Sequence, residues 1–146
     1  VYVGVDTSGS MCSHNGSRLA VEAVDQILRQ DKYETHLACI DTRLYPWQSA
    51  ENLKNIRFTG GGGTYLSTFF KEVLKIDRNP TEETPKPDVA VLITDGELAD
   101  EDWAEMAKQA SLYDNKGISM FVLITDPRVS CPSELRNLAK VFHSTK

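Results

Sequence analysis

Residues 89–96 are Val-Ala-Val-Leu-Ile-Thr-Asp-Gly, an uninterrupted apolar run that ends in a polar Thr-Asp-Gly. A strand that is apolar at every position is typical of a parallel sheet with helices covering both of its faces. Two further apolar runs, at 1–5 and at 118–124, have the same character. We therefore predict an α/β protein built on a mostly parallel central sheet.

Helical and strand patterns alternate between these runs, because apolar side chains recur at spacings of three to four residues in some segments and of two in others. A turn around residue 42 is predicted to join two strands into a hairpin, which places one antiparallel strand at the edge of the sheet. We expect strands at 36–40, 44–47 and 141–144, and helices at 17–30 with Ser17 as its cap and at 132–140. Two further helices are expected to face the core with apolar side chains: one after the glycine run, with Leu66, Phe69, Phe70 and Val73, and one from Asp100 or Glu101 to Gly117, with Trp103, Met106, Ala107 and Ala110.

The 146-residue length is typical of one domain. Its hydrophobic fraction of 40% and charged fraction of 25% match globular proteins and exclude extensive disorder. No apolar run approaches the roughly 20 residues that span a bilayer. The net charge of −5 argues against nucleic acid as a partner, since that interaction favours a basic face.

The three cysteines, Cys12, Cys39 and Cys131, are widely spaced and include no Cys-x-x-Cys pair. This pattern is typical of reduced thiols inside a cell, so we expect a cytoplasmic location. The chain begins within an apolar run and has no initiator methionine. We therefore expect residues 1–146 to be a single domain excised from a longer protein.

Oxygen-bearing side chains lie in three loops of the predicted fold. Asp6, Ser8 and Ser10 follow the first strand, Asp95 follows the strand at 89–94, and Thr64 ends a run of glycines before a helix. Ligands of open α/β sheets bind at the carboxyl ends of the strands, where these loops can converge. An all-oxygen ligand set suits Mg²⁺, Mn²⁺ or Ca²⁺ rather than Zn²⁺. Two carboxylates only balance a divalent ion, which leaves room for a carboxylate from another molecule.

Three segments resemble the metal-ion-dependent adhesion site of the von Willebrand factor type A (VWA) domain: Asp6-Thr7-Ser8-Gly9-Ser10, Thr64 and Thr94-Asp95-Gly96. The family pattern, Asp-x-Ser-x-Ser followed by Thr and then Asp, is matched at every position. The order of strands and helices is also similar over most of the chain. The resemblance implies a three-layer, Rossmann-like sandwich.

The resemblance also implies a role for each site residue. Ser8 and Ser10 would bind the metal directly, and Thr64 would do so when an acidic ligand is engaged. Asp6 and Asp95 would contact the metal directly or through water. A Glu or Asp of a partner protein would complete the site, so the implied function is protein interaction without catalysis and without a nucleic-acid or membrane partner. The sequence carries no signal for an oligomeric state.

The glycine run and the early Ser-Gly-Ser-Met look most like intracellular bacterial or phage members of the superfamily. Some of these accompany AAA+ ATPases or a metallopeptidase-like region. An alternative is a Mg²⁺-dependent phosphatase or phosphotransferase of the haloacid-dehalogenase type, with Asp6 after the first strand. Those enzymes place a second Asp, their general acid, where this chain has Ser8. A structural domain with a decayed site is a third alternative, and the intact ligand pattern argues against it.

An acidic group lies close to the predicted site in the sequence: Glu97, Asp100, Glu101 and Asp102. We interpret these residues as the solvated start of a helix, where negative charge complements the helix dipole. The alternative is a rim that tunes metal affinity or repels unsuitable ligands.

Overall fold

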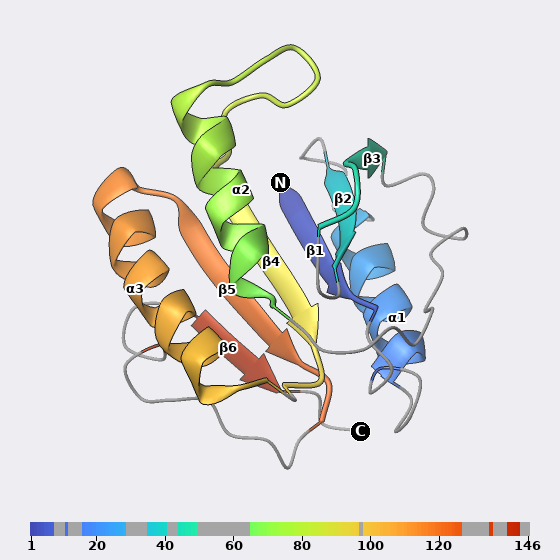
Figure 1. Ribbon diagram of the computed structural model, residues 1–146. Helices are drawn as coiled ribbons and strands as arrows, with labels where there is room; N and C mark the ends of the chain where they lie inside the picture. Colours follow the sequence, from blue (N-terminus) through green and yellow to red (C-terminus); the bar gives the residue numbers. More distant parts are fainter. Residues whose placement is uncertain are drawn as a thin grey trace.

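The structure is a computed structural model, and Figure 1 shows it as a ribbon. The residues that it describes are 1–7, 11, 16–28, 35–40, 44–49, 65–96, 98–126, 135 and 140–143. The strands are β1 (Tyr2–Asp6), β2 (His36–Ile40), β3 (Gln48–Ser49), β4 (Val89–Thr94), β5 (Ser119–Ile124) and β6 (Lys140–His143). The helices are α1 (Gly16–Leu28), α2 (Ser67–Arg78) and α3 (Asp100–Lys116).

The strands form one sheet in the order β3-β2-β1-β4-β5-β6. The five longer strands run parallel, whereas the two-residue β3 pairs antiparallel with β2 at one edge. The next two long strands in the sequence lie on opposite sides of β1: β2 on one side and β4 on the other. This reversal of strand order is where open α/β sheets bind their ligands.

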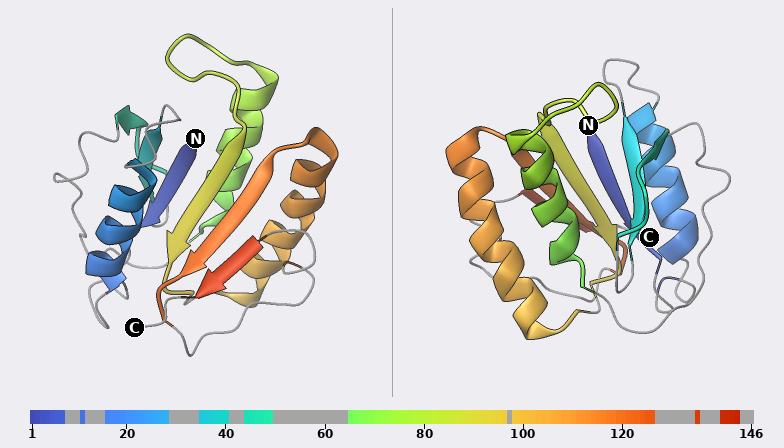
Figure 2. Two further views of the ribbon diagram at one scale, coloured as in Figure 1. Left: turned by 180° about the vertical axis from the view of Figure 1, so that it is seen from behind. Right: turned by 45° about the horizontal axis from the view of Figure 1, so that its top comes forward.

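Alternate residues of β1 contribute to two different cores. Val3 and Val5 pack with Ala20 of α1, whereas Tyr2 packs with apolar residues of α2 and α3. The helices therefore cover opposite faces of the sheet, with α1 on one face and α2 and α3 on the other (Figure 2). Because both faces are covered, every residue of β1 is buried.

Helix α2 packs so closely on β1 that Gly4 has no space for a side chain. A Cβ atom at Gly4 would lie 2.7 Å from Cδ1 of Phe69, well inside the roughly 3.5 Å at which carbon atoms make favourable contact. Phe69 is fully buried and packs edge-on against Phe70. The glycine within the first apolar run thus reflects this close approach.

Most of the predicted elements are confirmed. The strands at 36–40 and 89–94 have the predicted bounds, and α3 ends at Lys116, with Gly117 as its C-cap. The apolar residues predicted to face the core from α2 and α3 are all buried. Among the described residues, no helix is long and apolar enough to cross a membrane.

Several boundaries differ from the prediction, and three of these differences change the role of a residue. Pairing at the antiparallel edge lies at Gln48–Ser49 rather than at 44–47, where Leu44 makes only an isolated bridge to Ile40. Pro46 explains the shift, because it has no amide hydrogen for a strand ladder. Helix α1 begins at Gly16, so Ser17 lies within its first turn instead of capping it.

The third difference is at the last predicted helix, which does not reach Lys140. That residue belongs to β6, where it pairs with Phe121 of β5. A parallel partner here satisfies backbone groups of β5 that would otherwise form an open sheet edge. Of the rest of the predicted helix, Leu135 is described, and it is helical and fully buried.

Candidate metal centre

Asp6 is the last residue of β1, and its side chain is completely buried. Its Oδ2 accepts a 2.7 Å hydrogen bond from the hydroxyl of Thr94, the last residue of the neighbouring β4. The parallel register of these strands, in which Val5 lies opposite Ile93, brings both residues to the same edge of the sheet. The structure thus joins two of the three segments that the sequence predicts to converge.

The chain turns directly after β4. The amide of Gly96 donates a 3.0 Å hydrogen bond to the Thr94 hydroxyl, and Gly96 has a φ of 85°, in the left-handed region that favours glycine. Because the Thr94 hydroxyl accepts from Gly96, its own hydrogen is directed to Asp6. Asp95, between Thr94 and Gly96, is only 5% exposed.

Ser8 and Ser10 lie outside the described residues, but the residues that flank them in the chain are held firmly. The Thr7 amide donates a 2.9 Å hydrogen bond to the carbonyl of Ile40, at the end of β2. Met11 is fully buried, and its sulfur lies 4.0 Å from the hydroxyl of Thr125. Each of the two serines is one residue, about 3.8 Å between Cα atoms, from one of these anchors.

Thr64 also lies outside the described residues, but the chain is anchored just after it. The amides of Leu66 and Ser67 donate hydrogen bonds of 2.8 Å and 3.0 Å to the two carboxylate oxygens of Asp102, in the first turn of α3. Asp102 is 2% exposed, so its interpretation as part of a solvated helix start is wrong. The cause is α2, whose first amides have no partner within their own helix.

The other acidic residues near Asp102 behave as predicted or are not described. Asp100 and Glu101 are exposed at the start of α3, as expected for charges that complement a helix dipole. Glu97 lies outside the described residues. The acidic group therefore consists of side chains with different roles rather than one uniform rim.

One aspartate at this edge of the sheet is absent from the sequence prediction. Asp126 follows β5 and is 8% exposed, and the amide of its neighbour Thr125 donates a 2.8 Å hydrogen bond to the Thr94 carbonyl. Residues 123–126 repeat the Leu-Ile-Thr-Asp of residues 92–95. This repeated tetrapeptide is the signal that identifies Asp126 as a strand-end acid like Asp95.

The donor set at this edge fits a hard divalent cation. Asp6 and Asp95 bury two carboxylates at adjoining strand ends, an arrangement that is costly unless positive charge or hydrogen bonds compensate. In the described part of the chain, no group of three or more His, Cys, Asp or Glu side chains can hold a metal. The further oxygen ligands predicted from the sequence, the hydroxyls of Ser8, Ser10 and Thr64, lie outside the described residues.

The three-layer sandwich, with its oxygen-rich edge at the reversal of strand order, defines an α/β domain of the VWA type. The chain matches the VWA-like domain family (DUF2201) over residues 1–108, and it belongs to that family. No curated protein sequence matches it significantly.

Solved structures with the same fold come from very different proteins. An aerotolerance-related membrane protein from Bacteroides fragilis NCTC 9343 is 14% identical with a TM-score of 0.68, over 99% of this chain and 90% of that one. The manganese-loaded TRAP protein of Plasmodium vivax is 14% identical with a TM-score of 0.71, over 98% and 66%. The SpRpn10 VWA domain is 9% identical with a TM-score of 0.69, over 99% and 88%. At these identities the similarity concerns the fold alone.

Proposed function

We propose that the domain is a divalent-metal-dependent protein-interaction module whose metal binds an acidic side chain of a partner protein. The observation that carries this proposal is the buried Asp6–Thr94 hydrogen bond at the reversal of strand order, with the buried Asp95 next to it. Both acids lie where α/β sheets bind ligands. Family membership supports the proposal, because VWA-like domains are generally metal-dependent interaction modules.

The bound cation supplies positive charge at an edge of the protein that is otherwise acidic. A chain with a net charge of −5 repels an acidic partner at long range, and a metal reverses the sign of the potential locally. We assign Mg²⁺ to the site, with Mn²⁺ or Ca²⁺ as alternatives, and the manganese-loaded TRAP structure supports a divalent ion in this fold. The residues proposed to hold the metal are Asp6, Ser8, Ser10, Thr64 and Asp95.

The cellular setting is a further part of the proposal. The widely spaced cysteines support a cytoplasmic location. The resemblance of the glycine run at 60–63 to bacterial and phage members supports a place in a larger assembly with an AAA+ ATPase or a metallopeptidase-like region. Identification of the neighbouring domains in the parent protein tests this setting directly.

Calorimetric titration of Mg²⁺ or Mn²⁺ into the wild type and into Asp6→Ala tests the metal site. We expect binding heat in the wild type and none in the variant. Asp88→Ala is the matched control, because it removes the same charge from an exposed position at the opposite end of β4, and it should bind like the wild type. Absence of heat in the wild type, or equal heats in wild type and Asp6→Ala, contradicts the proposal.

We further propose that the domain catalyses no reaction. The site supplies ligands for a cation and a partner carboxylate, and Ser8 replaces the general acid of the phosphatase alternative. Hydrolysis of a generic phosphate ester, present in the wild type and lost in Asp6→Asn, would establish that alternative instead.

A further inference from the structure

We propose that Asp102 is a positioning residue of the metal centre, which acts by holding the first turn of α2 and thereby the chain that carries Thr64. This inference rests on the proposed function, since it concerns the same metal. In this proposal Asp102 acts on the backbone of α2 and not as a metal ligand, since its two carboxylate oxygens accept from the amides of Leu66 and Ser67.

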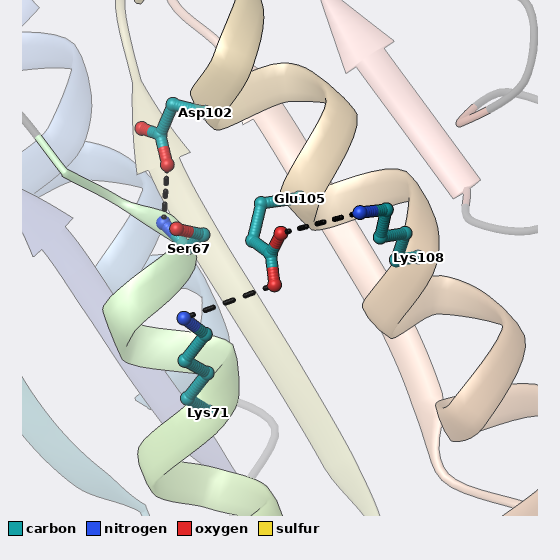
Figure 3. A network of polar contacts seen from close by, with 5 residues as sticks. All are labelled: Ser67, Lys71, Asp102, Glu105 and Lys108. Carbon is teal, nitrogen blue, oxygen red and sulfur yellow. Dashed lines mark hydrogen bonds and ion pairs between the residues drawn. The ribbon is translucent and has the colours of Figure 1, made fainter.

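The contact between Asp102 and α2 replaces a missing cap. Leu66, the N-cap of α2, makes no side-chain hydrogen bond of its own. The Asp102 carboxylate supplies an acceptor for each of the first two amides, those of Leu66 and Ser67. Hydrogen bonds to an ionised acceptor are about twice as strong as neutral ones. Figure 3 shows the carboxylate of Asp102 directed at the start of α2.

Asp102 is also tied to the other acidic segment of the site. Its amide donates a 3.0 Å hydrogen bond to the carbonyl of Ala99. Earlier in the chain, the amide of Leu98 donates a 2.9 Å hydrogen bond to the carbonyl of Gly96. The short segment from Asp95 to Asp102 is thus folded on itself by hydrogen bonds. Through Asp102, the loop that carries Asp95 is therefore connected to the loop that leads out of Thr64.

The short chain between Leu66 and Thr64 links the contact of Asp102 to a proposed metal ligand. Leu66 follows Thr64 by two residues, so their Cα atoms are at most about 7.6 Å apart, two steps of about 3.8 Å. A metal ligand must be held to within about 0.5 Å of its working position. In this proposal, the hydrogen bonds that fix Leu66 and Ser67 leave only Tyr65 between the fixed backbone and Thr64.

The exposed ion pairs beside Asp102 are less suited to this role. Lys71 lies 3.8 Å from Glu105, and Lys108 lies 3.9 Å from the same carboxylate, with all three side chains substantially exposed. Exposed ion pairs constrain geometry weakly, because water and salt compete with them. Of the two carboxylates in Figure 3, Asp102 is the buried one, and it contacts backbone rather than a flexible side chain.

Titration of Mn²⁺ in acetate buffer tests the proposal, with acetate in place of the partner's carboxylate. Asp102→Asn keeps the size of the side chain but replaces one acceptor with a donor, and we expect roughly tenfold weaker Mn²⁺ binding, as for residues that orient metal ligands. Asp77→Asn is the control: it alters an acid, 9% exposed, that pairs with Lys116 at the opposite end of the two helices. It should leave the affinity unchanged.

A double-mutant cycle separates positioning from general destabilisation. If Asp102 acts through Thr64, Asp102→Asn should weaken Mn²⁺ binding in the wild type but not in the Thr64→Ala background. Circular dichroism establishes that each variant is folded at the titration temperature, and Asp102→Ser replaces Asp102→Asn if the latter does not fold. Equal affinity in wild type and folded Asp102 variant, an equal loss in Asp77→Asn, or an equal loss in both backgrounds overturns the inference. A wild type that binds no Mn²⁺ overturns the proposed function instead.

Discussion

The two ends of the same sheet are closed by different chemistry. At the carboxyl end, a buried hydrogen bond joins Asp6 and Thr94, and Asp95 next to Thr94 is also buried. At the amino end, Tyr2 stacks on His36 at 4.9 Å between ring centroids and meets Trp47 edge-on at 5.0 Å. Aromatic packing is stable by itself, whereas buried carboxylates require compensation. The amino end of the sheet therefore stabilises the fold by packing alone, whereas the carboxyl end is where we propose that a cation binds.

The parallel helices α2 and α3 repeat this contrast along their length. Near the carboxyl end of the sheet they are joined by the buried Asp102, which accepts from two backbone amides. At the other end they are joined by Lys116 and Asp77, 3.3 Å apart, with the lysine side chain 39% exposed. The stronger and less adaptable link thus lies beside the candidate metal centre.

The largest effect on stability is expected at the amino end of the sheet, where the aromatic rings pack. Tyr2→Ala should lower the free energy of unfolding by about 3–5 kcal/mol, because Tyr2 is fully buried among rings. Chemical denaturation measures this loss. The affinity for Mn²⁺, measured where the variant is folded, should not change. A parallel loss of affinity would show that the two ends are not independent.

Metal binding at the carboxyl end of the sheet should raise the free energy of unfolding of the domain by somewhat less than Tyr2→Ala lowers it. Mn²⁺ at a hundred times its dissociation constant should add about 2.7 kcal/mol, which for a domain of this size raises the melting temperature by about 5–10 °C. EDTA should reverse the shift, and Asp6→Ala should show none. A shift that persists in Asp6→Ala would place the metal elsewhere.

The two ends of the helix pair should differ in their contribution to stability. Asp102→Asn leaves a buried amide opposed to a backbone donor, so we expect a loss of about 2 kcal/mol. Asp77→Asn weakens a partly exposed ion pair and should cost less than about 1 kcal/mol. Urea denaturation of both variants makes the comparison, and equal losses would contradict the contrast between the two ends.

The smallest predicted effect concerns alkaline pH. Burial, with a further contribution from Asp77, raises the pKa of Tyr113 well above its ordinary value, and its hydroxyl donates a 2.7 Å hydrogen bond to the Phe70 carbonyl. A raised pKa in the folded state stabilises the protein below the unfolded pKa of about 10. The contribution of Tyr113 to the free energy of unfolding should therefore decline by up to about 1.4 kcal/mol per pH unit above that value. Tyr113→Phe should show a shallower decline in alkaline denaturation.

Local pattern was sufficient for the strands β2 and β4. They have the predicted bounds because both are mostly buried and carry runs of apolar side chains, as expected for strands covered on both faces. Prediction was weaker at the edges of the sheet, where pairing depends on which backbone groups find partners. Pro46 displaced the antiparallel pairing to Gln48–Ser49, and β6 incorporated Lys140.

The candidate site shows the same division. The prediction that the loops after β1 and β4 meet is confirmed by the Asp6–Thr94 hydrogen bond, because the carboxyl ends of neighbouring parallel strands share an edge. Asp126 was missed, although its tetrapeptide repeats that of Asp95. The role of Asp102 was beyond local pattern, because its partners are the amides of Leu66 and Ser67, on another helix.

By itself, the sequence determined the α/β class, the faces of the helices and the set of oxygen-bearing residues after the strands. These follow from periodicity and from residue chemistry, which act between near neighbours in the chain. Only the tertiary structure decided which acid is solvated and which is buried. Asp100 and Asp102 are alike in sequence, but one faces water and the other meets the unsatisfied first turn of α2. That difference depends on how two helices pack, which no local pattern encodes.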